Sequence, residues 1–170
     1  MCKLKRIILH WTGGANFPNT TDLQHYHYVI DKGGKVTEGV FPVSANEVCK
    51  SYNNKALYAA HTGGGNTGSI GVAVCGMADY KGKLSDTKFP LTKIQVERMF
   101  SFTAELCKKY GIAVTPDTVL THYEFGKSHP NTASFGKIDI TILPPYLSVK
   151  PTEVGNFIRG KVKWYLEKMK

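Results

Sequence analysis

The stretch from Lys5 to His10 constrains the fold most, because three consecutive large aliphatic residues fill it without polar alternation. A strand that is apolar on both faces belongs at the centre of a sheet that is covered on both sides. Residues 69–75 form a second run of this kind. Strands and helices alternate along the chain, and this pattern predicts an α/β domain with a central mixed β-sheet flanked by helices.

Other elements are read from turn and cap signals. Residues 25–30 alternate as a strand, and the turn at 31–34 leads back into 35–38 as a hairpin. A helix follows Pro90: Thr92 and Gln95 form a capping box, and Gly111 ends it. Its expected apolar side consists of Ile94, Met99, Phe102, Leu106 and Tyr110. A strand is expected at 118–122, whereas residues 13–24 are rich in turn formers and predict at most a short turn of helix.

Three metal-binding groups are spread over the chain. His10 closes the first strand, His122 closes the strand at 118–122, and Asp139 follows. Two imidazoles and one carboxylate are typical of catalytic zinc sites, since they leave a fourth position open for water. Each residue also has an ordinary interpretation, as a hydrogen-bonded histidine or a turn aspartate. The combined pattern, with Lys137 two positions before Asp139, favours a hydrolase.

Six short motifs occur in a fixed order between residue 6 and about residue 145. They are ILHWT at 8–12, YHYVI at 26–30 with GGKV at 33–36, AHTG at 60–63 with Asn66, SIGV at 69–72, TH at 121–122 and GKID at 136–139. In these motifs the chain resembles the zinc-dependent N-acetylmuramoyl-L-alanine amidases of the amidase-2 type. That family includes phage lysozyme-type endolysins, bacterial cell-wall recycling amidases and animal peptidoglycan recognition proteins.

The resemblance implies a set of site residues. His10, His122 and Asp139 would hold Zn²⁺, which activates water and polarises the scissile carbonyl. Lys137 would stabilise the oxyanion, although a solvated loop lysine is the alternative. Tyr26 occupies the place of a catalytic tyrosine, with a packing role as its alternative. The recycling branch carries a glutamate where this chain has Ala73, and this difference favours the tyrosine-bearing endolysin branch.

The resemblance also implies the substrate, the amide between N-acetylmuramic acid and L-alanine of the peptidoglycan stem peptide. His61, Thr62 and Asn66 match a substrate-lining loop of the family. His129 is assigned to a surface loop rather than to the pocket, and His25 and His27 to structural roles.

The length of 170 residues suits one catalytic domain over 1–170, without a separate cell-wall-binding domain. The N-terminus lacks the apolar core of a signal peptide. We therefore expect a monomer that is synthesised in the host cytoplasm and reaches the cell wall in the periplasm after release, as a bacteriolytic phage endolysin does. A bacterial origin stays open. The four cysteines are expected to be free thiols, with Cys75 and Cys107 buried.

The alternatives are a cell-wall recycling amidase, a non-catalytic peptidoglycan-binding or regulatory module, and a nucleic-acid-binding protein. Retention of all three ligands argues against the non-catalytic module. The net charge of +9 suits any polyanion, but no basic run interleaved with aromatics occurs outside the C-terminus, so we expect no specific nucleic-acid partner. Residues 152–169 predict an amphipathic basic helix that completes the core. The alternative to a core role alone adds a second role, in which its cationic face and Trp164 bind anionic envelope surfaces.

Overall fold

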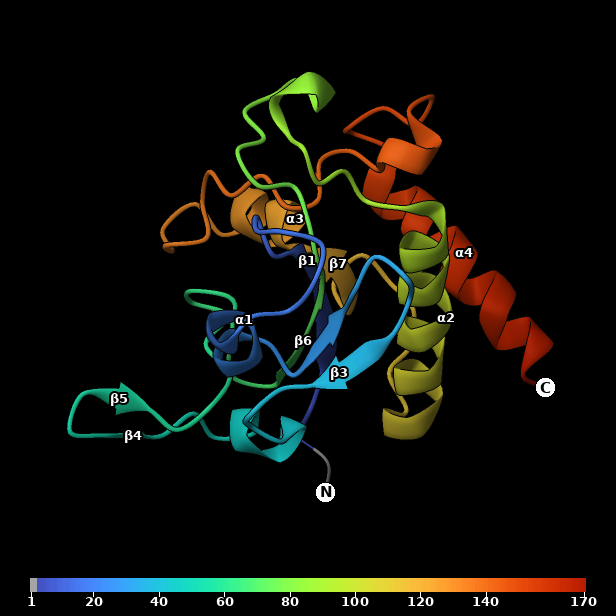
Figure 1. The fold of residues 1–170 in the computed structure, drawn as a ribbon. Helices are drawn as coiled ribbons and strands as arrows, with labels where there is room; N and C mark the ends of the chain where they lie inside the picture. Colours follow the sequence, from blue (N-terminus) through green and yellow to red (C-terminus); the bar gives the residue numbers. More distant parts are fainter. Residues whose placement is uncertain (1–2) are drawn as a thin grey trace.

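The computed structural model describes residues 3–170 and has a five-stranded sheet at its centre (Figure 1). The strand order is β3-β2-β6-β1-β7. The bounds are β1 Arg6–Trp11, β2 Tyr28–Ile30, β3 Val36–Glu38, β6 Ser69–Val74 and β7 Val119–Thr121. Four strands run parallel and β3 is antiparallel to β2. The predicted mixed sheet is therefore confirmed, with β1 inside it.

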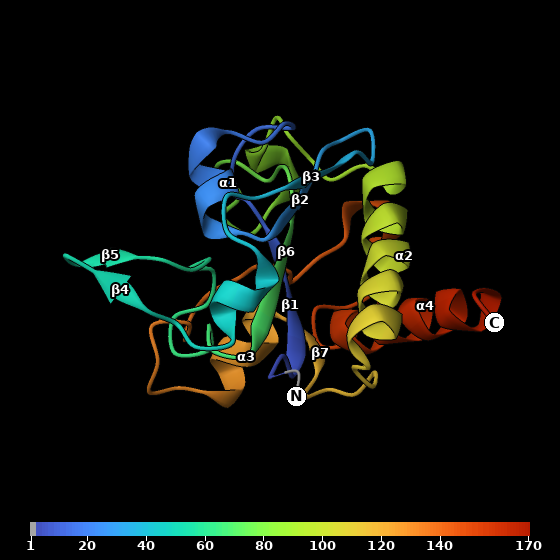
Figure 2. The ribbon, with the colours of Figure 1, turned by 90° about the horizontal axis from the view of Figure 1, so that it is seen from below.

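The helices are α1 Thr20–His25, α2 Lys93–Tyr110, α3 His122–Ser128 and α4 Val154–Lys168. Three short 3-10 helices, η1 to η3, cover Val43–Asn46, Leu84–Asp86 and Pro144–Tyr146. Helices α2 and α4 lie on one side of the sheet, and α1 and α3 lie on the other (Figure 2). A small hairpin of β4 (Ser51–Tyr52) and β5 (Lys55–Ala56) projects from the α1 and α3 side.

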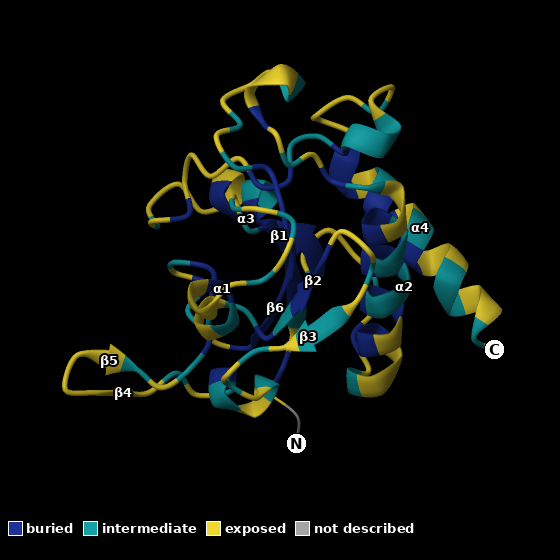
Figure 3. Ribbon diagram, in the orientation of Figure 1, coloured by how far each residue is buried: buried dark blue, intermediate teal, exposed yellow. Residues whose placement is uncertain are grey.

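The two faces of β1 explain this layering. Ile7 and Leu9 point into a large apolar cluster with α2 and α4, whereas Ile8 belongs to a small cluster with Leu120 and Phe125. Successive strand residues point to opposite faces, so His10 lies on the same side as Ile8. Figure 3 shows the central strands β1 and β6 as buried, whereas the edge strand β3 is intermediate to exposed.

Helix α2 begins and ends as predicted. Thr92 and Gln95 form the capping box, and Gly111 ends the helix in the left-handed region at φ 64°. The amide of Gln95 also donates to the carbonyls of Ile30 and Cys75, which fixes the helix to the ends of β2 and β6. The placement of Ile94 on the apolar side is wrong. Ile94 is 66% exposed because it lies in the first turn of α2, beside the β2–β3 turn, where a Cβ at Gly34 would lie 3.1 Å from its Cγ2 methyl.

Two predicted strands are shorter than expected. The strand at 25–30 begins only at Tyr28, because residues 20–25 form α1 under a capping box of Asn19 and Asp22. Tyr26 is the C-cap of that helix. The strand at 118–122 ends at Thr121, whose side chain caps α3 together with Glu124. His122 is therefore the first residue of a helix and not the last of a strand.

The expected helix at 152–169 is observed as α4, two residues shorter at its start and one residue shorter at its end. Val154, Ile158 and Val162 are buried against α2 and the sheet, so its core role is confirmed. Arg159 is buried too, and its guanidinium donates to the carbonyl of Val119 and the carboxylate of Glu124.

Within the described chain, every helix is too short or too polar to span a bilayer. Cys49, Cys75 and Cys107 are free thiols, the last two buried as expected. Cys2 lies outside the described residues.

Candidate metal centre

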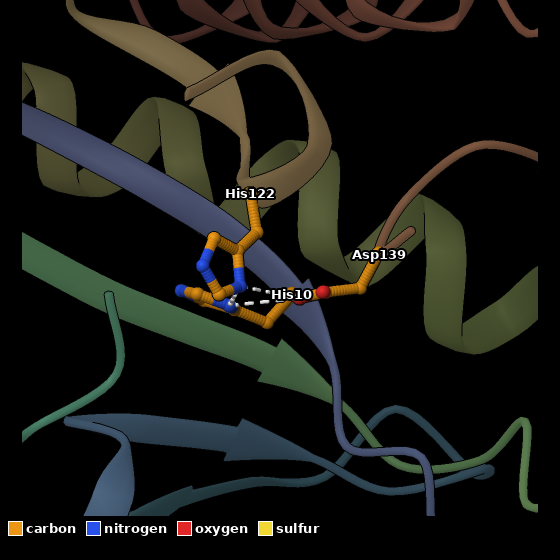
Figure 4. A group of neighbouring side chains, drawn as sticks. All are labelled: His10, His122 and Asp139. Atoms are coloured by element: carbon orange, nitrogen blue, oxygen red, sulfur yellow. Dashed lines mark hydrogen bonds and ion pairs between the residues drawn. The ribbon is translucent and has the colours of Figure 1, made fainter. Parts of the chain in front are cut away.

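The three predicted ligands meet at the carboxyl end of the central strands. His10 comes from β1, His122 from the β7–α3 junction and Asp139 from the loop after α3. His10 Nδ1 lies 2.9 Å from Asp139 Oδ2 and 3.1 Å from His122 Nδ1, and His122 Nδ1 lies 3.2 Å from Asp139 Oδ2. All three side chains are buried and point toward one another (Figure 4). The group is therefore able to hold a metal ion.

This triangle has the size that a tetrahedral ion needs. Zinc takes nitrogen and oxygen ligands at about 2.0–2.1 Å, so two ligands of a tetrahedron lie about 3.3 Å apart. The contacts between the ligand atoms, 2.9–3.2 Å, come close to that value. Hydrogen bonds alone do not explain why these three ligand atoms lie so close together. If each Nδ1 carried a proton for Asp139, the two N–H groups would face each other at 3.1 Å.

The electrostatics favour the charge states of metal ligands. Burial lowers the pKa of His10 to about 4, although the nearby Asp139 opposes the shift. Burial by itself would raise the pKa of Asp139, but its hydrogen-bonding contacts with His10 and His122 outweigh burial and hold that pKa below its usual value. A neutral imidazole and an ionised carboxylate are the forms that bind metals.

A second set of contacts lies behind the histidines. His10 Nε2 is 3.1 Å from His61 Nδ1 and 3.3 Å from Thr62 Oγ1. His122 Nε2 is 2.9 Å from Ser134 Oγ. No motif in the sequence pointed to Ser134. Its hydroxyl donates a hydrogen bond to the carbonyl of Gly63, which lies 71 positions away in the chain.

An open cavity of about 460 Å³ gives access to the cluster. Tyr26 and Lys137 line it beside the candidate ligands. The Tyr26 ring lies 5.1 Å from the His10 ring, and burial raises the pKa of its phenol, as do the charges of Asp139 and Asp22. Lys137 is exposed to the cavity. Gly13 and His25 form part of the wall, so both ends of the segment 13–25 border the cleft.

The three residues of the predicted substrate-binding loop lie in different positions relative to the cavity. His61 lines the cavity, while Thr62 is fully buried beneath it. Asn66 lies outside the lining, and its side-chain oxygen accepts from the backbone N–H groups of His61 and Thr62. These contacts give Asn66 a loop-shaping position, and the substrate-binding roles of the three residues stay predictions. His129 stacks on Phe125 at 3.9 Å and is not part of the cavity lining.

Ala73 lies directly beside the candidate ligand His10. In the parallel pair of β1 and β6, His10 and Ala73 are register partners. Residues in register on neighbouring strands share a face of the sheet. A glutamate at position 73 would therefore lie next to His10, where this chain has only a buried methyl group.

A parallel sheet with such a cluster at its carboxyl edge suits a metal-dependent hydrolase. Residues 2–135 match the family model described as N-acetylmuramoyl-L-alanine amidase. The chain belongs to this family of peptidoglycan amidases. The match ends before Lys137 and Asp139, so the structure, and not the family match, places these two residues at the site. No curated protein matches the sequence.

Several solved structures share the fold. A single-residue mutant of PlyL is 18% identical, with 95% of this chain and 85% of that chain covered and a TM-score of 0.54. AmpDh3 from Pseudomonas aeruginosa is 18% identical, with 85% and 57% covered and a TM-score of 0.54. AmiD from E. coli, in complex with anhydro-N-acetylmuramic acid-L-Ala-D-gamma-Glu-L-Lys, is 15% identical, with 79% and 51% covered and a TM-score of 0.50. At these identities the likeness establishes the fold alone.

Proposed function

We propose that this protein is a zinc-dependent amidase that cuts the bond between N-acetylmuramic acid and L-alanine of the peptidoglycan stem peptide. The observation that carries the proposal is the convergence of His10 Nδ1, His122 Nδ1 and Asp139 Oδ2 at tetrahedral spacing below an open cavity. Zinc, when bound there, supplies Lewis-acid chemistry that activates water and polarises an amide carbonyl.

The residues around the cavity divide the remaining tasks. Lys137 places a cation at the cavity wall, two residues from Asp139, where an oxyanion forms when water adds to the amide. A well-aimed donor of this kind contributes about 3–4 kcal/mol to the stability of the transition state. The phenol of Tyr26 stays protonated, since burial raises its pKa, and it donates a hydrogen bond into the cavity.

The endolysin assignment is supported by two positions next to His10. Ala73 occupies the register position where a carboxylate would be needed for the recycling type of site, and the Tyr26 ring packs 5.1 Å from the His10 ring. The proposed role is lysis of the host cell by a monomer that is made in the cytoplasm and acts on the wall after release. A recycling amidase is the second candidate, and the nature of the natural substrate distinguishes the two.

The direct test is mass spectrometry of peptidoglycan after digestion. The proposal expects free stem peptides and glycan chains of unchanged length, because only the lactyl amide is cut. Shortened glycan chains or cleaved stem peptides would identify another bond. Cleavage of cell-wall sacculi in preference to soluble anhydro-muropeptides supports the endolysin role, and the reverse preference supports recycling.

Zinc dependence has its own test. His122→Ala and Asp139→Ala each remove one of three ligands, so both variants are expected to lose zinc and activity together. Zinc content by elemental analysis and the rate of wall-turbidity loss are measured on the same preparations. Full activity in a zinc-free preparation would contradict the mechanism, and zinc binding without hydrolysis in the parent would favour the non-catalytic module.

Binding of α4 to anionic envelope surfaces is a separate proposal. Trp164 is 54% exposed, and Lys168 lies 5.1 Å above its ring. Lys163 and Lys168 form no ion pair with any residue in the described part of the chain, whereas Arg159, Lys161 and Lys170 are paired. The cationic surface of α4 is therefore smaller than its composition indicates.

Truncation after Pro151 would remove the buried face of α4, so charge changes give the sharper test. The double variant Lys163→Gln/Lys168→Gln is expected to bind phosphatidylglycerol vesicles more weakly while it hydrolyses purified peptidoglycan at the parent rate. The matched control is Lys50→Gln/Lys55→Gln, which changes the same charge on the β4–β5 hairpin. Equal vesicle binding by both double variants would contradict a role for α4.

A further inference from the structure

We propose that Ser134 and His61 are positioning residues that fix the tautomers of His122 and His10, so that both Nδ1 lone pairs are free for a metal ion. This inference rests on the proposed zinc site. Neither residue touches the three ligand atoms directly. Each acts on the far nitrogen of a ligand imidazole, at 2.9 Å for Ser134 and 3.1 Å for His61.

The first step concerns His122. The Ser134 hydroxyl donates to the carbonyl of Gly63 at 2.7 Å, and a carbonyl oxygen only accepts. The Ser134 proton is therefore committed, and only lone pairs remain toward His122 Nε2. Nε2 must carry the imidazole proton to make this hydrogen bond. A neutral imidazole has one N–H, so Nδ1 presents a lone pair to the metal position.

The second step concerns His10 and follows the same logic. His61 Nε2 lies 3.4 Å from the carbonyl of Ser69, so Nε2 of His61 is the donor. His61 Nδ1 is then an acceptor, and it lies 3.1 Å from His10 Nε2. The Thr62 hydroxyl donates to the single lone pair of His61 Nδ1 at 2.7 Å, so the Thr62 oxygen, which His61 orients in this way, is the acceptor left for His10 Nε2 at 3.3 Å. The proton of His10 is placed on Nε2, and Nδ1 is left free.

The His61 ring fits only because its neighbour on β6 is glycine. A Cβ atom at Gly71 would come within 2.5 Å of the ring. The imidazole therefore packs against the backbone of Gly71, next to His10.

The two supports are mechanically linked. His61 and Gly63 belong to one loop, and Ser134 belongs to the segment packed against it. A Cβ at Gly63 would lie 2.8 Å from the Cβ of Ala133, and one at Gly64 would lie 2.4 Å from the Cγ2 of Thr132. The backbones can approach this closely only with glycines in the first loop. The contact between the loops thus aligns both ligand imidazoles at once.

The expected size of the effect follows from this geometry. Outer-shell partners of metal-bound histidines fix ring orientation, and their loss typically weakens metal affinity by about 10–100-fold. Ser134→Ala removes the only hydrogen-bond partner observed for His122 Nε2 in the described structure. The zinc dissociation constant is therefore expected to rise by about 10–100-fold. Thr132→Val is the matched control, since it removes a hydroxyl that donates to the carbonyl of His129 and accepts from the backbone N–H of Ser134 but leaves the Ser134 hydroxyl in place.

The experiment has two readouts. Long-range ¹H–¹⁵N correlation spectra of the zinc-bound protein report which nitrogen of each histidine is protonated and which binds the metal. Competition with a chelator gives the zinc dissociation constant of the parent, Ser134→Ala and Thr132→Val. In the parent, both His10 and His122 are expected as Nε2–H tautomers. Ser134→Ala is expected to give mixed tautomers for His122 alone and weaker zinc binding, and Thr132→Val is expected to change neither.

Each other outcome overturns the proposal. An Nδ1–H tautomer of His122 or His10 in the parent contradicts the corresponding support, and this holds even if Ser134→Ala fails to fold. A Ser134→Ala variant with parent zinc affinity contradicts the role of Ser134. A parent that binds no zinc contradicts the proposed function, whereas a parent that binds zinc through Nε2 of His10 or His122 contradicts only the corresponding support.

Discussion

The two faces of the central sheet carry different kinds of side chains, although the same strands supply both. The face toward α2 and α4 is apolar and continuous. On the opposite face, the buried apolar cluster contains only Ile8, Leu120 and Phe125. Beside Ala73, that face carries buried polar side chains that are joined by hydrogen bonds, and they include His10, His27, Asn46, His61 and His122. One face thus supplies most of the hydrophobic stabilisation, and the other supplies the chemistry.

The comparison predicts different consequences for two buried phenyl rings, and this is the largest effect expected. Phe100→Ala and Phe125→Ala each remove a fully buried ring and should each lower the free energy of unfolding by about 3–5 kcal/mol. Phe125 also supports the loop at Gly65, where a Cβ would approach its ring to 2.4 Å. Only Phe125→Ala should therefore also weaken zinc binding. Urea unfolding of the metal-free proteins measures the loss of stability, and chelator competition measures zinc affinity. Equal zinc affinities of the two variants would contradict the predicted difference between the two faces.

The variant Lys137→Ala tests whether a residue on the polar face can contribute to the rate without contributing to zinc binding. Lys137→Ala is expected to keep the zinc and to lower the rate by a factor that corresponds to about 3–4 kcal/mol, because the cation acts only where charge develops. Zinc content and turnover on purified peptidoglycan are compared with those of Lys127→Ala, a control on α3. Hydrolysis by Lys137→Ala at the parent rate would return this residue to an ordinary loop position.

His27, on the polar face, is expected to make the unfolding free energy depend on pH. Its Nε2 donates to Asn46 Oδ1, and its Nδ1 accepts from the N–H of Gly71, so both nitrogens are used in the neutral form. Burial lowers its pKa from 6.5 to about 4. The unfolded chain therefore takes up the proton first as the pH falls. Neutral His27 therefore contributes its full stabilisation of the folded state above pH 6.5, and about 3 kcal/mol of this stabilisation is lost as the pH falls to 4.

The matching variant is His27→Asn, which cannot be protonated in this range. Its unfolding free energy should depend less steeply on pH between 6.5 and 4 than that of the parent, by about one proton. His10 and His61 also have lowered pKa values, so a residual dependence is expected. Parallel curves for parent and variant would mean that His27 is protonated in the folded state.

The smallest of these effects concerns Tyr26. Tyr26→Phe removes only the hydroxyl and should lower turnover by about 10²-fold, with folding and zinc content nearly unchanged, if the phenol donates a hydrogen bond in the transition state. Tyr28→Phe is the matched control, since Tyr28 packs against Phe102 on the other side of the molecule. Unchanged turnover in Tyr26→Phe would give Tyr26 a packing role.

The sequence predicted the elements whose signals are local. The apolar run of β1 and the capping box at Thr92 depend on neighbouring residues, and both are confirmed. The boundary at His122 was misplaced, because the apolar run of β7 obscured a second readable capping box, Thr121 with Glu124. The place of Ser134 beside the site cannot be predicted from the sequence, because it depends on a hydrogen bond to a carbonyl 71 residues away. Asp139 was found through the joint pattern, since a single aspartate has no distinctive signal.

The spacing of the three ligands along the chain also has a consequence for synthesis. His10 is separated from His122 by 112 positions, and Asp139 follows 17 positions later. Strand β1, which carries His10, pairs on one side with β7 and therefore waits for residues far along the chain. A polypeptide emerging from the ribosome holds one ligand of the three until His122 has been translated. Metal capture is therefore coupled to synthesis as far as Asp139, and fragments that stop before Asp139 lack the full site.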